Sequence, residues 1–338
     1  MDLKTTYMGI ELKHPVVASA SPLSESLDGI KRLEDSGAAA VVMFSIFEEQ
    51  ILFEEQIRNS NEEFARFMEF DSESLTESLS YFPDVDDYAV GPEDYLELIH
   101  SATESVDIPV FASLNCITSE GWVDYARQME QAGAHGLELN IYAVEPNLKI
   151  SGAEVDQRYV DILSMVKGAV TIPVALKLSP FFSSIGHMAQ QLDEAGADAL
   201  VLFNRFYQPD IDIEQLAVAP RLKLSTYDEI RLPLLWIALL SGQIKASIGA
   251  TSGVESSDEV IKYLLAGADA AMTTSSLLRN GPAHIGKLVD GLERWMEARG
   301  FDSVSQIKGI MNRQRVKNPG AYDRSNYIKL LEGYTLIY

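Results

Sequence analysis

Two short segments rich in glycine and hydroxyl side chains have the composition of a phosphate-binding site. The first is Gly249-Ala-Thr-Ser-Gly253, and the Ser256-Ser257-Asp258 that follows predicts the cap of a helix beginning near Glu259. The second is Thr273-Thr-Ser-Ser276. Backbone N–H groups in a tight turn, or at the positive end of a helix, bind phosphate dianions. The two segments together therefore predict a site for a phosphate-bearing ligand.

One lysine and two asparagines are further candidates for contact with a ligand. Lys177 lies between Leu176 and Leu178, and an ammonium group is costly to bury without a partner, so we expect Lys177 to point into a ligand cavity. Asn140 and Asn204 each end a leucine-rich run and offer amide donors and acceptors to a planar polar ligand. Asparagine also ends strands for reasons of turn conformation, and that alternative stays open.

The histidines do not have the spacing of a metal site. They form no H-x-x-x-H or H-E-x-x-H pattern, and we expect them to be structural or exposed: His14, His100, His135, His187 and His284.

Apolar runs that alternate with amphipathic segments predict the elements that position these residues. Proline suits the first residue of a strand, and four runs begin at a proline or its equivalent: 14–20, 108–114, 172–178 and 243–249. A glycine that ends a helix in a left-handed cap leads into four more, after a Gly-Ala pair: 37–43, 133–140, 196–203 and 267–273. Helical patterns lie between them, for example 122–131, 185–194, 232–240 and 258–265.

Eight such units favour an α/β fold of the (β/α)₈ TIM-barrel type over an open doubly wound sheet. No G-x-G-x-x-G follows the first strand, which weakens a dinucleotide-binding interpretation. In a barrel the strand ends converge at one face, so the two hydroxyl-rich segments, after the seventh and eighth strands, are expected to meet there.

We expect one domain over residues 1–313. Its insertion at 44–107, after the second strand, is predicted to be a lid or substrate-binding region, with a plain surface excursion as the alternative. A C-terminal extension is predicted to form helices at 285–299 and 303–313, and a tail at 314–338 that packs on the barrel or on a partner.

Charge and cysteine content exclude several classes of function. Fifty acidic and 27 basic residues give a net charge of -23, which repels nucleic acid and anionic membrane surfaces. The single cysteine, Cys116, rules out an internal disulfide and fits a reducing compartment. No secretory signal or long uncharged apolar stretch is present, so we expect a cytoplasmic protein without a membrane anchor.

The strand ends resemble those of the dihydroorotate dehydrogenase family and of the related pyrimidine-binding domain of dihydropyrimidine dehydrogenases. The resemblance extends from about residue 3 to 313 and rests on Pro15 to Ser21, Gly136-Leu-Glu-Leu-Asn140, Leu176-Lys-Leu-Ser-Pro180, Asn204, the two hydroxyl-rich segments and Leu277 to Pro282. It implies an FMN cofactor and an oxidoreductase of pyrimidine metabolism, in which a loop base removes a proton and a hydride passes to flavin N5.

The resemblance also implies roles for individual residues. Ala20 and Ser21 would lie along the flavin, with Lys177 near its N1/O2 edge and Asn140 and Asn204 at the boundary between flavin and substrate. The phosphate would be held by Ser225, Thr226, Ser252, Gly253, Thr274 and Ser275.

The chain departs from the family pattern at the end of the site where the chemistry takes place. Met43-Phe44-Ser45 replaces a segment that usually carries a lysine, and no clear counterpart of the family's substrate loop is found within 72–92. The loop from Asn140 to Asn147 is two residues longer than usual. One way of counting puts Ala143, which cannot take a proton, at the position of the base. The other puts Glu145 there, with Asn147 as a substrate contact. Tyr142 is an alternative base if its phenol is activated, and an exposed glutamate in a remodelled loop is the alternative for Glu145.

Three functions follow as alternatives. The first is an FMN-dependent dehydrogenase acting on a C–C bond of a dihydropyrimidine-like small molecule, with Glu145 as base and Lys177 as a catalytic cation. We expect it to form a homodimer and to use an electron-transfer partner protein. The second is an FMN-binding subunit or sensor without catalysis of its own. The third is a sugar-phosphate lyase or isomerase that uses Lys177.

Overall fold

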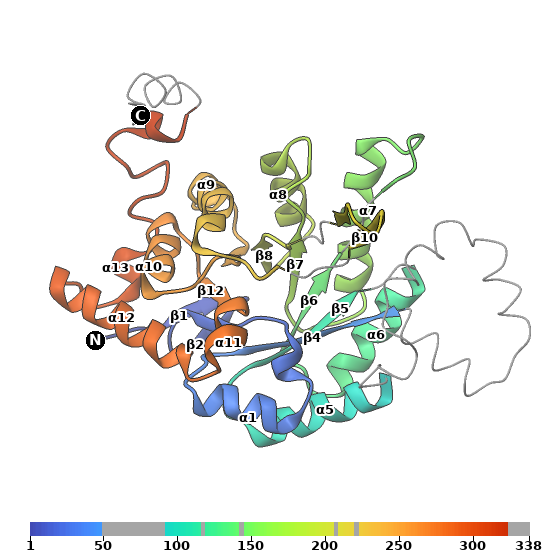
Figure 1. The fold of residues 1–338 in the computed structure, drawn as a ribbon, viewed down its shortest axis with the longest axis horizontal. Coiled ribbons are helices and arrows are strands. Elements are labelled where there is room, and N and C mark those ends of the chain that lie inside the picture. Colours follow the sequence, from blue (N-terminus) through green and yellow to red (C-terminus); the bar gives the residue numbers. More distant parts are fainter. Residues whose placement is uncertain (49–91, 116–118, 142–144, 206–208, 220–222, 324–338) are drawn as a thin grey trace, which may run out of the picture.

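The computed structural model describes residues 1–48, 92–115, 119–141, 145–205, 209–219 and 223–323. Eight parallel strands close into a barrel in the order β11-β12-β3-β4-β5-β6-β7-β8, and helices surround it (Figure 1). The predicted (β/α)₈ class is confirmed. The strands are β3 Val16–Ala18, β4 Val41–Phe47, β5 Val110–Asn115, β6 Gly136–Asn140, β7 Val174–Leu178, β8 Ala199–Leu202, β11 Ser247–Ala250 and β12 Ala270–Thr273.

Alternation along each strand decides which side chains enter the barrel. On β6, Leu137 and Leu139 belong to the apolar layer between strands and helices, so Glu138 and Asn140 point inward. On β7 the leucines at 176 and 178 take the outer positions and Lys177 takes the inner one. The strands of the barrel are buried on both sides, which explains their almost continuous apolar runs.

The helices begin and end close to the predicted positions. They are α1 Leu27–Asp35, α5 Pro92–Ser105, α6 Ser119–Gln131, α7 Gly152–Lys167, α8 Ile185–Glu194, α9 Arg231–Leu240, α10 Ser257–Ala266, α11 Ser275–Asn280, α12 His284–Arg299 and α13 Val304–Ile307. The glycines of the four Gly-Ala pairs all have positive φ, between 94° and 119°: Gly37, Gly133, Gly196 and Gly267. They turn the chain out of a helix and into the next strand.

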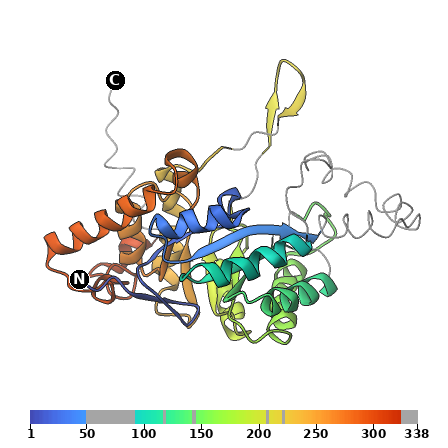
Figure 2. The ribbon, with the colours of Figure 1, turned by 90° about the horizontal axis from the view of Figure 1, so that it is seen from below.

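Two antiparallel hairpins were not predicted. The first, β1 Thr5–Tyr7 with β2 Ile10–Leu12, inserts Tyr7 among the inward-facing residues of the barrel, where its ring packs edge-on against Phe111. This hairpin closes the N-terminal end of the barrel. The second, β9 Asp210–Asp212 with β10 Ala217–Ala219, stands away from the barrel in Figure 2.

The prediction that the second strand ends at Met43 is wrong. Strand β4 continues to Phe47, because a register shift between Val42 and Ser45 lets the strand resume its pairing with β5. The ring of Phe44 packs edge-on against Tyr95 of α5, with ring centroids 4.9 Å apart.

The predicted 44–107 insertion therefore divides into three parts. Residues 44–47 belong to β4, and 92–105 form α5, which packs against α1 and β5. Residues 49–91 lie outside the described part of the chain, so the predicted role of this region stays a prediction.

The predicted helix at 303–313 is also wrong in length. Only the single turn α13 forms. After it, the backbone hydrogen-bonds to other helices instead of continuing its own helix. Gly309 has φ of 71°, and its N–H donates to Leu264 O at the end of α10, while Met311 N–H donates to Leu265 O. Arg313 is ion-paired with Asp323 of the tail at 3.1 Å, and residues 324–338 lie outside the described part. None of the described helices is long and apolar enough to cross a membrane.

Candidate functional site

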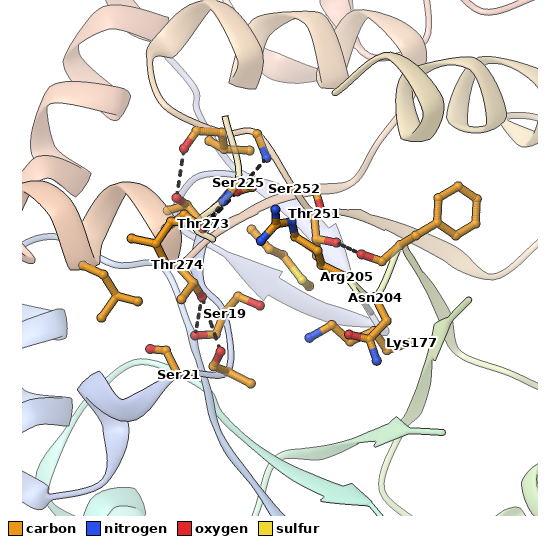
Figure 3. Close-up of a pocket in the computed structure, with 18 of the residues that line it drawn as sticks. Ser19, Ser21, Lys177, Asn204, Arg205, Ser225, Thr251, Ser252, Thr273 and Thr274 are labelled. Carbon is orange, nitrogen blue, oxygen red and sulfur yellow. Dashed lines mark hydrogen bonds between the residues drawn. The ribbon is translucent and has the colours of Figure 1, made fainter. Parts of the chain in front are cut away.

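A cavity of about 300 Å³ opens at the C-terminal ends of the strands (Figure 3). It is lined by residues from the ends of β3, β7, β8, β11 and β12 and from the loops that follow them: Ser19, Ala20, Ser21, Pro22, Lys177, Phe203, Asn204, Arg205, Leu224, Ser225, Thr251, Ser252, Gly253, Val254, Met272, Thr273, Thr274, Ser275 and Leu278. Parallel strands bring these segments together although up to 259 positions separate them in the sequence, from Ser19 to Leu278.

The charge of the cavity is opposite to that of the chain. Among the described residues that line it, Lys177 and Arg205 are cationic and none is aspartate or glutamate. The chain as a whole carries a net charge of -23. Each of the two cations has a carboxylate partner outside the lining, Glu138 and Glu229, so the lining offers cationic groups to an anionic ligand without a large net positive charge.

One end of the cavity is built from backbone turns and hydroxyl groups. Ser252 and Gly253 have φ values of 74° and 71°, and a non-glycine residue in this region costs about 1 kcal/mol. A Cβ atom on Gly253 would lie 2.7 Å from Thr226 O and from Ile230 Cγ2, so only glycine fits there without a shift. The two left-handed residues make a tight turn that brings the backbone close to the cavity, where only a residue without a side chain fits at position 253.

Hydroxyl and backbone groups from several segments meet at this end. Ser225 Oγ is 2.9 Å from Ser275 Oγ, and it accepts a hydrogen bond from Gly253 N at 3.2 Å. Thr274 Oγ1 donates to Ser19 O at 3.2 Å, which ties the end of β12 to the end of β3 beside Ala20.

Hydrogen bonds from helix α10 and within the cavity wall hold this end in place. Helix α10 begins after Ser256, whose hydroxyl and backbone N–H both lie 2.8 Å from the Glu259 carboxylate, as the predicted cap requires. The hydroxyl of Tyr263 lies within hydrogen-bond distance of Thr251 O and Ser252 O. Thr273 Oγ1 donates to Val254 O at 3.1 Å.

The other end of the cavity contains the predicted lysine, and the structure supplies a partner for it. Lys177 Nζ lies 3.2 Å from Glu138 Oε1, with side-chain exposures of 11% and 3%. Glu138 was not among the predicted site residues. A signal for it was present, because it stands two residues before Asn140 and therefore faces the same side of the strand.

The two predicted asparagines are also brought together. Asn204 Nδ2 donates to Asn140 Oδ1 at 2.5 Å, and Asn140 Nδ2 donates to Ser45 Oγ at 3.2 Å. Ser45 Oγ is in turn 2.7 Å from Ser113 Oγ. Asn204 lines the cavity, whereas Asn140 supports it from beside the cavity wall. The amides therefore have fixed orientations at this end.

Arg205 is a lining residue that the sequence analysis missed, although it directly follows Asn204. Its Nε donates to Glu229 Oε2 at 2.9 Å, and Glu229 also accepts from the backbone N–H of Thr226. Thr226, a predicted phosphate residue, thus supports the adjoining turn and does not itself line the cavity. Sequence spacing gave no reason to expect that an arginine would be held here by a glutamate 24 positions away.

The predicted base and substrate residues lie elsewhere. Glu145 Oε2 is 3.2 Å from Arg158 Nη2 on α7, and Glu145 Oε1 accepts from the backbone N–H of Asn147. Neither residue lines the cavity, and Asn147 is exposed. The alternative candidates Tyr142 and Ala143 lie outside the described residues. The structure thus brings together the predicted lysine, Asn204 and most of the predicted phosphate residues, but not Glu145 and Asn147.

Within the described residues, no group of three histidine, cysteine, aspartate or glutamate side chains is arranged to hold a metal ion. His14, for example, is buried and bonded to the backbone through both ring nitrogens.

Comparison with known proteins agrees with the fold and with the strand ends. The family model described as dihydroorotate dehydrogenase matches residues 89–296. The catalytic subunit of dihydroorotate dehydrogenase B (NAD(+)) from Thermoplasma acidophilum is 28% identical over 319 residues, which cover 91% of this chain and 98% of the relative. The same subunit from Methanocaldococcus jannaschii is 28% identical over 316 residues, covering 91% and 97%.

A third relative, the putative dihydroorotate dehydrogenase A (fumarate) of Aeropyrum pernix, is 29% identical over 225 residues, which cover 64% of this chain and 72% of the relative. The family match spans more than half of the chain, and two of these alignments extend over nearly all of it. The chain is therefore a divergent member of the dihydroorotate dehydrogenase family, whose members are oxidoreductases that act on CH–CH groups.

Proposed function

We propose that this protein binds FMN in the cavity and exchanges a hydride with a dihydropyrimidine-like small molecule. The observation that carries the proposal is the division of the cavity into two ends. Ser225, Ser252–Gly253 and Thr274–Ser275 form one end, and Lys177 with Asn204 forms the other. A ligand with a phosphate at one end and a polar ring at the other matches this division.

The donor set fits the FMN phosphate. The hydroxyl groups of Ser225 and Ser275 are donors of the kind that phosphate oxygens accept. The Gly253 N–H donates to Ser225 Oγ in the structure, so this N–H would have to exchange that bond to reach a phosphate directly. The close approach of Gly253 to Thr226 O leaves space for a backbone turn but not for a side chain, as expected where backbone must reach a ligand.

At the other end, the chain's own groups can orient a ring and balance its charge. Lys177 supplies a cation, and the Asn204 amide, held by Asn140, supplies a hydrogen bond of fixed direction. Ala20 and Ser21 also line the cavity. FMN would supply the hydride acceptor at N5. A fixed cation near the flavin edge stabilises the negative charge that reduction adds.

For the proton we propose Glu145 as the base, with Asn147 as a substrate contact. Support comes from their place in the loop that begins at Asn140, beside the cavity. The ion pair with Arg158 must open, or the loop must shift, before Glu145 reaches a substrate. That requirement is also the observation that favours the second candidate, an FMN-binding subunit or sensor without independent catalysis.

Reconstitution with FMN tests these functions. The purified chain is expected to bind FMN and show a flavin spectrum, and a panel of dihydroorotate, dihydrouracil and related compounds is then added without oxygen. Bleaching by any member supports the dehydrogenase. A flavin spectrum that no member bleaches favours the subunit or sensor. A chain that takes up no FMN contradicts both flavin functions. That result would favour the third alternative, a sugar-phosphate lyase or isomerase that uses Lys177.

For partners, we propose a homodimer that works with an electron-transfer protein in the cytoplasm. Four of the exposed large apolar side chains cluster on the β9–β10 hairpin: Ile211, Ile213, Leu216 and Val218. Exposed apolar clusters of this kind often mark protein contacts. Light scattering of the full chain, with a variant carrying serine at Ile213 and Leu216, tests the dimer. Equal masses for the wild type and the variant would show that the hairpin is not part of a dimer interface.

A further inference from the structure

The carboxylate of Glu138 lies inside the barrel, directly beneath the end of the cavity that contains Lys177. In the register of β6 with β7, Asn140 lies beside Lys177 and Glu138 lies beside Ala175, one inward position deeper. The strand register therefore sets this ion pair, independently of any loop.

The ion pair is nearly closed off from solvent. Glu138 is 3% exposed in its side chain and Lys177 11%, and their closest atoms, Oε1 and Nζ, are 3.2 Å apart. The second oxygen of the carboxylate, Oε2, is buried and has no hydrogen-bond partner among the described residues. The negative charge of Glu138 is thus directed at one cation and little weakened by other donors.

The other polar groups around the pair do not replace either charge. Burial raises the pKa of the Tyr7 phenol well above its usual value, and the charges of Glu138 and, more weakly, Asp269 add to that effect, so Tyr7 stays neutral. Burial, together with the charge of Glu138, likewise raises the pKa of Tyr95 on α5. Arg205, the other cation of the cavity, is engaged by Glu229.

We propose that Glu138 is a positioning residue that keeps Lys177 in place as a charged ammonium at the floor of the cavity. A buried ammonium without a counter-ion tends to lose its proton, and the neutral amine would no longer balance a negative ligand. With Glu138 beneath it, Lys177 presents a fixed positive charge. That this charge balances reduced FMN rests on the proposed function. That Glu138 keeps Lys177 charged does not.

The test measures the charge of Lys177 directly in the full chain without added flavin. Trace acetylation with acetic anhydride, followed across a range of pH and read by mass spectrometry, reports the neutral fraction of each lysine. Glu138→Gln keeps the size of the side chain and removes its charge. Asp269→Asn is the matched control, because it removes the carboxylate that pairs with Lys308 at the opposite end of the barrel.

In Glu138→Gln we expect Lys177 to acetylate about tenfold faster at neutral pH, since an opposite charge at this distance favours the ammonium by that factor or more. Asp269→Asn should leave the Lys177 profile unchanged and alter that of Lys308. Glu138→Asp keeps the charge at a longer distance and should give a smaller change in the same direction, which keeps the test available if Glu138→Gln does not fold. A Lys177 profile that is the same in all of these proteins overturns the proposal.

A second readout extends the test to the cofactor. After reconstitution, the midpoint potential of the bound flavin is expected to shift in Glu138→Gln and to remain unchanged in Asp269→Asn. A purely structural role would lower the unfolding temperature of Glu138→Gln without moving either the potential or the acetylation profile. If the wild-type chain takes up no FMN, the proposed cofactor is wrong, and the acetylation of Lys177 still decides the role of Glu138.

Discussion

The hydroxyl oxygen of Tyr263 lies 2.8 Å from the carbonyl oxygen of Ser252, which connects helix α10 to the turn that lines the cavity. The same hydroxyl is 3.0 Å from Thr251 O, so its single proton is shared between two neighbouring carbonyls. Burial raises the pKa of the Tyr263 phenol above its usual value, with the charges of Glu259 and Glu229 contributing, and the group therefore acts as a neutral donor. The helix thereby fixes the backbone turn that lines the cavity.

Removal of this hydroxyl tests whether the turn is a cofactor-binding element. Tyr263→Phe is expected to weaken FMN binding by about fivefold, because the net value of such a hydrogen bond is about 1 kcal/mol. Fluorescence titration with FMN measures the affinity. Tyr322→Phe is the matched control, because Tyr322 also donates to a backbone carbonyl, that of Met311, and does not line the cavity. Equal affinities for the two variants would show that the turn does not depend on Tyr263.

The close packing at Gly253 gives a second, larger effect. Gly253→Ala is expected to lower the free energy of unfolding by about 3 kcal/mol, of which about 1 kcal/mol comes from the positive φ and the rest from contact with Thr226 O and Ile230. Gly300 has φ of 74° and open space around its Cβ position, so Gly300→Ala isolates the cost of φ alone. Urea denaturation of both variants measures the difference, and FMN titration should show a loss for Gly253→Ala only. Similar stabilities would mean that the neighbours of Gly253 can move aside.

Sequence patterns predicted the barrel because its strands and helix ends carry local signals. The Gly-Ala pair at Gly267 is a local turn requirement, and the apolar run around Lys177 is the mark of a strand buried on both sides. Once eight such units close, the geometry of the barrel brings their ends together. That is why Asn204, Ser252 and Thr274, chosen from strand ends alone, line one cavity.

Features that depend on contacts between distant segments were not predictable in this way. The continuation of β4 past Met43 depends on pairing with β5, including that of Ser45 with Ser113. The partner of Lys177 became evident only when β6 and β7 were in register. In each case the decisive neighbour is far away in the sequence. Alternation on β6 places Glu138 inside the barrel, but it does not say which cation Glu138 meets.

A third prediction concerns the base. Glu145→Gln is expected to bind FMN as the wild type does and to lose flavin reduction by an oxidisable substrate, because an amide cannot accept the proton. Stopped-flow measurement of flavin bleaching under anaerobic conditions separates the two steps. Arg158→Met serves as the companion variant: it frees Glu145 from its ion pair and should leave reduction intact or faster. Unchanged bleaching in Glu145→Gln would remove Glu145 from the mechanism.

A fourth prediction concerns stability against acid and begins from His14. The ring accepts a hydrogen bond from Val16 N–H at Nδ1 and donates from Nε2 to Gly37 O, and burial lowers its pKa to about 4. A proton on Nδ1 would break the bond to Val16. Because the unfolded chain takes up this proton near the usual histidine value and the folded chain does not, the stabilising effect is complete above that value. It is lost as the pH falls from there toward 4.

Between about pH 7 and pH 5 the contribution of His14 to this loss amounts to about 2 kcal/mol. The variant His14→Gln lacks the titrating ring, so its unfolding free energy should fall less steeply with acid, whatever its value at neutral pH. His100→Gln is the control, since His100 is 61% exposed in its side chain and should leave the wild-type slope unchanged. Urea denaturation at several pH values gives the slopes. If His14→Gln and His100→Gln lose stability in parallel as the pH falls, the His14 imidazole is not the cause of the acid sensitivity of the fold.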